Sequence, residues 1–396
     1  MRAHLAIVLL AIWSLGASIP ALSSRPGAPV TLYLDFTGAP SFTWYSTTVP
    51  ATPAFDLDND PSTFNGAEVA VATDTFNRVV DFYSPFDINV TTVDPGALTQ
   101  YHVERVIIGG DPAAWTNSSV GGVGSVNGFF DSNSSGRTAF VFPMNVGNGA
   151  IGISRSIAHE IGHTFGLDHH SLYDINGNKT ATYDPGNASV APIMGTSYGA
   201  TRALWYDSAG ETSASIFQDD LAILSTTPNG PRYRTDDVGS TTSTSGALAA
   251  YSGGLTADGV IEQTTDSDWF GFSVPTTSSV TLDLEPRLSM GMFRAKIQLR
   301  DALGNLITEQ DSTSTLGASF TASLSPGTYF AVADSHGGYG DVGEYTLTVA
   351  GNVLPAGPVP EPEIVAMGVA IFLLLRARCH PRAGQASSTP CPLSNR

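Results

Sequence analysis

Residues 159–170 decide how the centre of this chain folds, and they read His159-Glu160-Ile161-Gly162-His163-Thr164-Phe165-Gly166-Leu167-Asp168-His169-His170. Residues four apart share one face of an α-helix, so His159 and His163 direct their imidazoles to the same side. Gly166 is expected to end this helix, because glycine readily adopts a left-handed conformation at a helix C-terminus. The chain can then turn and bring His169 to the same point.

Three converging imidazoles are typical of a catalytic zinc site, which keeps a fourth position for water. Glu160 lies one step round the helix, where its carboxylate can take a proton from that water. The complete pattern H-E-x-x-H-x-x-G-x-x-H therefore predicts one catalytic Zn²⁺ on His159, His163 and His169, with Glu160 as the general base. The alternative of ordinary surface or core histidines gives no reason for this spacing.

The same residues resemble the zinc motif of the metzincin endopeptidases, and within them the bacterial matrixin-like enzymes. A Met-containing turn matches as well, at Ala191-Pro192-Ile193-Met194-Gly195. The resemblance implies an α+β catalytic domain with a mixed twisted sheet, an active-site helix and a Met-turn in which Met194 packs beneath the zinc. It also implies hydrolysis of peptide bonds in a protein or peptide substrate.

The chain departs from this family pattern at two positions. Matrixins carry Ser directly after the third ligand, whereas His170 stands here. Three roles are open to His170, those of a surplus ligand, a transition-state donor and an exposed side chain, and we favour the exposed side chain. Astacin- and serralysin-like enzymes have Tyr two residues after the Met, where this chain has Thr196, and the nearest tyrosine is Tyr198.

Apolar periodicity outlines the rest of a catalytic domain at residues 28–230. Strands are expected at residues 30–35, 88–93, 103–108 and 139–142, and helices at 62–82, 150–165 and 212–224. The Gly-rich residues 121–130 are either an edge strand that pairs with an extended substrate or a flexible loop.

The pattern of apolar and turn residues changes after a Ser/Thr/Gly-rich linker at residues 231–247. Short alternating segments separated by turn signals predict an all-β sandwich at residues 248–351. Asp266-Ser267-Asp268-Trp269-Phe270 and Leu324-Ser325-Pro326-Gly327-Thr328-Tyr329 resemble bacterial pre-peptidase C-terminal domains. The resemblance implies a module that binds an extracellular polysaccharide or protein, or that is removed on maturation.

Both termini carry targeting patterns. Residues 1–23 read as a secretory signal peptide, with cleavage after Ala17 or Ser23. Residues 358–382 contain Pro-Glu-Pro, a short apolar run and then Arg. They resemble a PEP-CTERM sorting segment, which an exosortase-like enzyme cuts. Residues 383–396 form a short tail after it. A single-pass transmembrane helix is the alternative. We therefore expect an exported protein, anchored at the cell surface or released.

The acidic balance limits the choice of partners. A formal charge of −18 excludes nucleic acid, because phosphate binding needs clustered cations. Two acidic loops offer oxygen ligands at alternate positions and are candidate structural Ca²⁺ sites. Their residues are Asp56, Asp58 and Asp60 in the first loop, and Asp174, Asn176 and Asn178 in the second. For Asp60 or Ser62, capping of the following helix is the alternative.

These patterns predict a secreted or surface zinc metalloendopeptidase. The alternatives are a non-catalytic adhesion protein with a structural zinc, and metal-dependent hydrolysis of a non-peptide bond. Glu160 argues against a structural zinc, since a purely structural site needs no carboxylate beside an open position.

Overall fold

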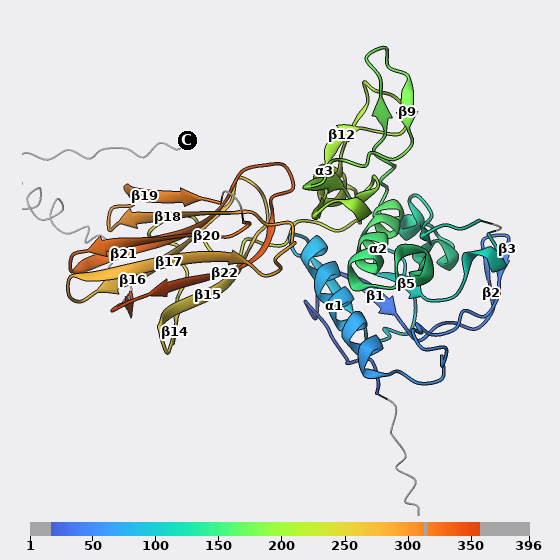
Figure 1. Cartoon of the computed structure of the whole chain (residues 1–396), viewed down its shortest axis with the longest axis horizontal. Coiled ribbons are helices and arrows are strands. Elements are labelled where there is room, and N and C mark those ends of the chain that lie inside the picture. Colours follow the sequence, from blue (N-terminus) through green and yellow to red (C-terminus); the bar gives the residue numbers. More distant parts are fainter. Residues whose placement is uncertain (1–16, 117, 313–314, 357–396) are drawn as a thin grey trace, which may run out of the picture. The chain divides into compact units, whose positions relative to one another are not determined.

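The computed structural model describes residues 17–116, 118–312 and 315–356 (Figure 1). The predicted sorting segment at 358–382, the tail and most of the signal peptide lie outside these residues. Among the described residues, no helix is both long enough and apolar enough to cross a membrane.

A five-stranded sheet organises the first domain, in the order β4-β1-β5-β7-β6. Its strands are β1 (Val30–Asp35), β4 (Ile88–Thr91), β5 (Val103–Ile108), β6 (Gly122–Val123) and β7 (Thr138–Val141). The first four strands in this order are parallel, and β6 at the edge is antiparallel to β7. This confirms the predicted mixed sheet, although the edge strand is much shorter than the Gly-rich segment.

Two helices pack their apolar faces against this sheet. They are α1 (Gly66–Tyr83) and α2 (Ala150–Thr164). In α2, Ile153, Ile157 and Ile161 recur every four residues and are fully buried. The predicted start of α1 at residue 62 is wrong. Asn65 caps the helix, because its side chain accepts the N–H groups of Ala67 and Glu68 while the Glu68 carboxylate accepts the N–H of Asn65.

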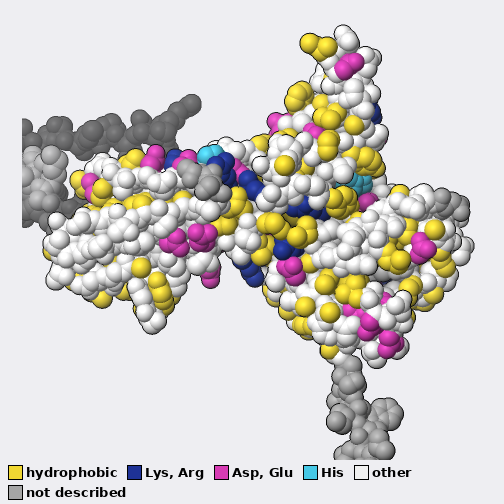
Figure 2. Space-filling view, viewed as in Figure 1, with side chains coloured by type: hydrophobic (Ala, Val, Ile, Leu, Met, Phe, Trp, Pro, Cys, Tyr) yellow, Lys and Arg dark blue, Asp and Glu magenta, His cyan; other side chains and the backbone are white. Residues whose placement is uncertain are grey.

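Short strand pairs and one helix complete this domain. The pairs are β2 (Phe42–Trp44) with β3 (Thr47–Val49), β8 (Leu172–Tyr173) with β9 (Lys179–Ala181), β10 (Val190–Pro192) with β11 (Arg202–Leu204), and β12 (Asp207–Ala209) with β13 (Phe217–Asp219). The predicted helix 212–224 is wrong in its first half, because residues 217–219 pair with β12; only α3 (Asp220–Thr226) is helical. The turn of the β8–β9 hairpin is polar apart from Ile175, whose side chain is fully exposed. Figure 2 shows hydrophobic and acidic side chains together at the end of the projecting segment that contains β9.

Two five-stranded sheets form the second domain, in the orders β14-β15-β22-β17-β20 and β19-β18-β21-β16-β23. The strands are β14 (Ala249–Tyr251), β15 (Gly254–Ile261), β16 (Ser267–Val274), β17 (Ser278–Pro286), β18 (Ala295–Asp301), β19 (Leu306–Asp311), β20 (Ala318–Leu324), β21 (Gly327–Ser335), β22 (Gly343–Ala350) and β23 (Leu354–Pro355). Inward side chains such as Leu282, Phe272 and Ile297 are fully buried. The predicted β-sandwich is confirmed.

Residues 17–24 contact the first domain near the start of α1 and along β4. Ala17 N–H donates to Phe64 O, Leu22 N–H to Thr92 Oγ1, and Ser24 N–H to Val90 O, each at 2.9 Å. Part of the predicted signal peptide therefore belongs to the packed domain.

Candidate metal centre and active-site cleft

Helix α2 and the turn after it bring three imidazoles together. One ring nitrogen from each of His159, His163 and His169 lies within 4.8 Å of the others. The Nε2 atoms of His163 and His169 are 3.0 Å apart. His159 and His163 share a face of α2, whereas His169 arrives from the segment that follows the helix.

Each of these imidazoles has an oxygen beside its other ring nitrogen. Nδ1 of His159 lies 2.8 Å from Ile193 O, and Nδ1 of His163 lies 2.7 Å from Leu167 O. Nδ1 of His169 lies 2.9 Å from Oε2 of Glu211. Carbonyl oxygens can only accept, so the first two contacts place the ring protons of His159 and His163 on Nδ1. The contact between His169 and Glu211 is equally short but lacks hydrogen-bond alignment. The Nε2 atoms of His163 and His169 face each other.

This donor set fits a zinc ion. Two imidazole lone pairs at 3.0 Å repel each other unless a cation lies between them. Burial lowers the pKa of His159 to about 3 and that of His163 to about 4, so both rings are neutral, as metal ligands must be. Three neutral imidazoles are a ligand set that suits zinc rather than calcium or magnesium.

Gly166 supplies the turn that returns the chain to the centre. Its φ is +104°, a conformation that other residues rarely adopt. Gly166 N–H donates to His163 O, and Leu167 N–H donates to Gly162 O, both at 2.9 Å. These bonds satisfy carbonyls at the end of α2 and carry the chain on toward His169.

Met194 lies in a turn beneath the imidazoles and is fully buried. A Cβ at Gly162 would lie 2.5 Å from the Met194 sulfur, so the missing side chain lets the sulfur pack against α2. Two backbone carbonyls of this turn also hold the metal segment: Ile193 O orients His159, and Met194 O accepts the N–H of His170 at 2.9 Å.

Glu160 lies against the edge strand. Its side chain is 9% exposed, and burial raises its pKa to about 8, with the backbone of Gly124 opposing the shift. A Cβ at Gly122 would lie 2.5 Å from Glu160 Cγ, and one at Gly124 would lie 2.3 Å from Glu160 O. Only glycine at these two positions allows β6 to approach α2 so closely.

A cleft of about 240 Å³ opens between β6 and the Met-turn. Val120, Gly121 and Gly122 line it on one side, and Tyr183, Gly195, Thr196 and Tyr198 line it elsewhere, with His159 and Glu160 between them. The Tyr198 hydroxyl lies 2.6 Å from Ser156 Oγ of α2. The Tyr183 ring packs against His169, with 4.4 Å between ring centroids.

Comparison with known families accounts for this geometry. Residues 65–170 match the reprolysin-like M12B metallopeptidase family. This part of the chain is a metallopeptidase domain. The match runs from Asn65, which caps α1, to His170. The matched family implies a zinc cofactor, and the cluster of His159, His163 and His169 fits this metal. The prediction of a metalloprotease is thereby confirmed at the level of a metallopeptidase domain.

Two further comparisons concern other proteins. Part of the chain is similar to the crystal structure of the pre-peptidase C-terminal domain of a collagenase from Bacillus anthracis, with 15% identity and a TM-score of 0.20. The similarity covers 24% of this chain and 86% of that one. No curated protein matches the chain.

His170 is not exposed, contrary to the role that we favoured. Its side chain is fully buried in the metallopeptidase domain, and its Nε2 lies 3.0 Å from Oδ1 of Asp220. Ser208 Oγ lies 2.8 Å from its Nδ1. The ring thus points away from the three imidazoles, into a polar network at the start of α3.

The candidate calcium loops differ from each other. Asp56 and Asp58 gather with Glu68 rather than with Asp60. Both Glu68 oxygens already accept backbone N–H groups, so this group needs no ion to be satisfied. Asp60 instead accepts from Ser62 and Thr63. In the second loop, Asp174 accepts the N–H groups of Asn176 and Asn178 in a turn, and no metal-binding group was found there among the described residues. Calcium stays a prediction at both loops.

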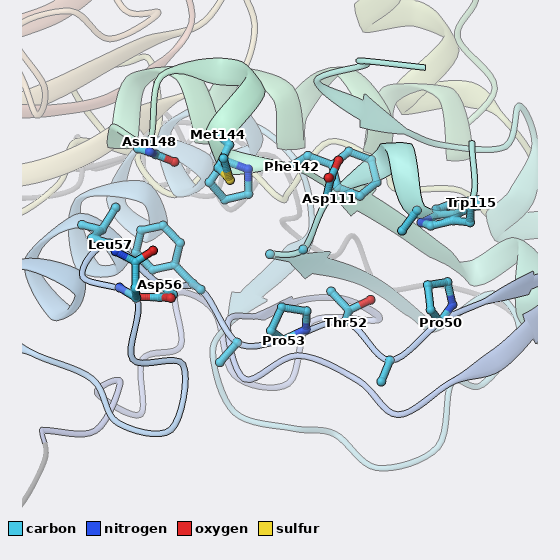
Figure 3. Close-up of a pocket in the computed structure, with 18 residues that line it drawn as sticks. Pro50, Thr52, Pro53, Asp56, Leu57, Asp111, Trp115, Phe142, Met144 and Asn148 are labelled. Carbon is cyan, nitrogen blue, oxygen red and sulfur yellow. The ribbon is translucent and has the colours of Figure 1, made fainter. Parts of the chain in front are cut away.

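A separate cavity of about 490 Å³ lies away from the histidines (Figure 3). Pro53, Trp115, Phe142 and Met144 give it apolar walls, and Asp56 and Asp111 are its acidic residues. It contains neither Glu160 nor an imidazole, so it takes no part in the chemistry of the cleft.

Sequence reasoning found the three zinc ligands, Glu160 and the residues Gly166 and Met194, and it missed further residues that reach the site from other elements. Glu211, Tyr183, Gly122 and Gly124 belong to the second group. The only signal for any of them was the run of glycines at residues 121–128, which we interpreted as an edge strand or a loop.

Proposed function

We propose that this protein is an exported zinc endopeptidase, which cleaves internal peptide bonds of its protein substrates. One observation carries the proposal: three neutral imidazoles converge beside Glu160 in a cleft whose wall is a sheet edge. The metallopeptidase domain supports peptide bonds as the target, and a cleft bordered by a strand suits an extended polypeptide.

Bound zinc would supply Lewis-acid activation of water and of the scissile carbonyl. His159, His163 and His169 hold the metal, each oriented through the oxygen beside its Nδ1. Glu160 accepts the proton of the attacking water and then passes it to the departing amine nitrogen. The raised pKa of Glu160 in the protein alone suits a group that must both take and return a proton.

Strand β6 would hold the substrate. It pairs with β7 on one side, so its other edge is available to an added strand within the described residues. Backbone hydrogen bonds to β6 would lay an extended peptide across the cleft, next to Glu160.

Export rests on the N-terminal pattern, and the packing of residues 17–24 narrows the cleavage site. Cleavage after Ser23 would remove Leu22, whose N–H donates to Thr92 Oγ1, whereas cleavage after Ala17 keeps this contact. We therefore favour Ala17, which N-terminal sequencing of the exported protein would test. The exosortase-like sorting enzyme, and a polysaccharide or protein ligand of the sandwich, remain proposals from sequence.

The decisive experiment compares the full chain with Glu160→Gln and with Glu309→Gln, a matched change in the sandwich. Each protein is assayed for zinc content and for cleavage of a denatured protein, with and without a zinc chelator. We expect equal zinc in all three, and cleavage reduced about 100- to 10,000-fold in Glu160→Gln alone. The adhesion alternative gains if the unmodified chain binds zinc and cleaves nothing in a broad peptide library.

A further inference from the structure

The cavity of Figure 3 lies at the carboxyl ends of two strands of the peptidase sheet. Residues 109–111 directly follow β5, residues 142–144 directly follow β7, and residues 50–57 form the opposite side. Open sheets with parallel strands commonly bind ligands at this end. The volume of about 490 Å³ falls within the about 300–1,000 Å³ that is typical of ligand sites.

The walls of this cavity offer apolar surface to a ligand. The Trp115 ring is held in place by other rings, with centroids 5.0 Å from Phe140 and 6.3 Å from Phe142. Met144 is 75% exposed, although its side chain is apolar and belongs to the cavity wall. A ligand with apolar atoms would cover this flexible side chain and lie against the rigid indole.

The charge of the cavity has one sign. Asp56 and Asp111 belong to the wall, and the described lining residues include no Lys, Arg or His. Oδ1 of Asp111 accepts the N–H of Ala113, and Oδ1 of Asp56 accepts the N–H of Asp58, both at 2.9 Å. Neither Oδ2 takes part in a hydrogen bond among the described residues. Two carboxylates beside apolar walls suit a ligand that is both cationic and apolar.

The cavity and the active-site cleft are joined by one short segment, η4 (Pro143–Val146). Its first residues line the cavity, whereas Asn145 Nδ2 donates to Val120 O at 2.8 Å. Phe142, which also lines the cavity, donates its N–H to Gly121 O at 2.9 Å. Val120 and Gly121 line the cleft. A ligand that extends beyond the cleft along β6 can therefore reach the cavity.

The direction and distance of this path follow from the fold. A substrate that pairs antiparallel with β6, the commoner arrangement of adjacent strands, runs in the same direction as β7. Its residues after the scissile bond then approach the end of β7. Asn148 lines the cavity twelve residues before Glu160, which corresponds to about 18 Å along a helix. An extended peptide spans this distance with about five residues.

We propose that this cavity binds an arginine or lysine of the substrate, with an apolar neighbour, about five residues C-terminal to the scissile bond. The cationic group would pair with Asp56 and Asp111, while the aliphatic stem and the neighbouring side chain would lie on Trp115 and Met144. The inference rests on the proposed endopeptidase function and adds a preference for basic substrates. The formal charge of −18 favours the approach of such substrates to the protein.

Binding is tested on the full, zinc-loaded chain with dansyl-phenylalanyl-arginine amide, followed by fluorescence anisotropy. The matched probe carries citrulline, which has the shape of arginine without its charge. We expect the arginine probe to bind at least about tenfold more tightly, because a charged hydrogen-bond pair is lost with citrulline. Asp111→Asn should remove this difference, and it leaves a side-chain oxygen to accept the Ala113 N–H.

Two further variants control for folding and for charge. Met144→Ser changes an exposed side chain, so it should fold normally and weaken the binding of both probes. Asp94→Asn removes one exposed carboxylate outside the cavity and should bind both probes as the unmodified chain does. Equal affinity for the two probes, or unchanged arginine binding in Asp111→Asn, would overturn the proposed site.

The position relative to the scissile bond is tested with peptides based on one sequence that the protein cleaves. Arginine or citrulline is placed in turn at each of the residues after the cleaved bond. We expect arginine to lower KM about four to six residues after the bond and to leave kcat unchanged, because this contact is equal in ground and transition states. An effect of arginine only before the bond would contradict the proposed path. Probe binding that depends on Asp111, in a chain that cleaves nothing, would support the site and reject the endopeptidase function.

Discussion

Nε2 of His170 lies 3.0 Å from Oδ1 of Asp220, and neither side chain is exposed to solvent. The contact links the residue after the third zinc ligand to the first residue of α3. Asp220 also accepts the N–H of Tyr206 at 2.9 Å, so one carboxylate holds three separate segments together. The end of the metal-binding segment is thus held in place by a buried polar contact, and it does not face the solvent.

Replacing Asp220 should therefore destabilise the metallopeptidase domain. Asp220→Asn keeps the shape but removes the charge facing His170, and loss of one partner of a buried pair typically costs about 3–5 kcal/mol. Urea unfolding of the zinc-loaded chain measures the change in unfolding free energy. Asp207→Asn, at an exposed position of β12, is the control and should change it by less than about 0.5 kcal/mol. Equal stability of the two variants would contradict the structural role of the pair.

The glycines of the edge strand should matter for activity more than for zinc. Gly124→Ala places a Cβ 2.3 Å from the Glu160 carbonyl, so β6 must move away from the general base. We expect a loss of cleavage of about 100-fold, because small misplacements of catalytic groups have large kinetic effects. Zinc content, measured beside activity, should remain complete. Gly199→Ala, where an added Cβ meets nothing within 4 Å, should cleave normally.

Glu211 should act on zinc affinity through His169. Its carboxylate lies 2.9 Å from His169 Nδ1 and, unlike the carbonyls beside the other two imidazoles, can be changed by mutation. Glu211→Gln should weaken zinc binding about 10- to 100-fold, the usual effect of losing such a partner. Competition with a chromophoric chelator measures the affinity without relying on cleavage. An affinity within about twofold of the unmodified chain would mean that Glu211 does not orient the ligand.

Two buried carboxyl groups of the sandwich, those of Glu262 and Asp268, should make stability fall as pH rises. The folded-state pKa values of about 9 for Glu262 and about 8 for Asp268 exceed the ordinary carboxyl value of about 4. Between these limits the folded protein binds more protons than the unfolded chain, so its stability is complete below this window and declines across it. Urea midpoints at several pH values test this. Glu262→Gln should show a shallower decline, and a parallel one would argue against the shifted pKa.

Local patterns predicted the part of the site that one helix can supply. The i, i+4 spacing of His159 and His163 follows from helix geometry, and Gly166 was expected to break the helix from its residue type alone. The five-stranded sheet was also accessible, because buried parallel strands are nearly continuous apolar runs. In the sandwich, β19 gives a weak strand pattern, since its only apolar residues are Leu306 and Ile307 and none of its side chains is fully buried.

The remaining contacts depend on tertiary structure. Asp220 is 50 residues from His170. Glu211 lies in the loop between β12 and β13, directly before the segment 212–224 that we predicted to be a helix. Apolar spacing after residue 212 fits a helix, but pairing of residues 217–219 with β12 overrides it. The start of α1 was misplaced because Asp60, Ser62 and Asn65 are all good capping residues, and only Asn65 has Glu68 three positions later.

Strand β6 has a further consequence for the behaviour of the protein in solution. An edge that accepts a substrate backbone is equally open to a strand of a second copy, which is a common start of aggregation. Here the edge strand has only two residues, and glycines precede it and follow it closely. A strand of two residues can pair with one extended peptide across the cleft. It has too few backbone groups to start continuous strand pairing between molecules. The shortness of β6 therefore allows an accessible sheet edge that gives little opportunity for pairing between molecules.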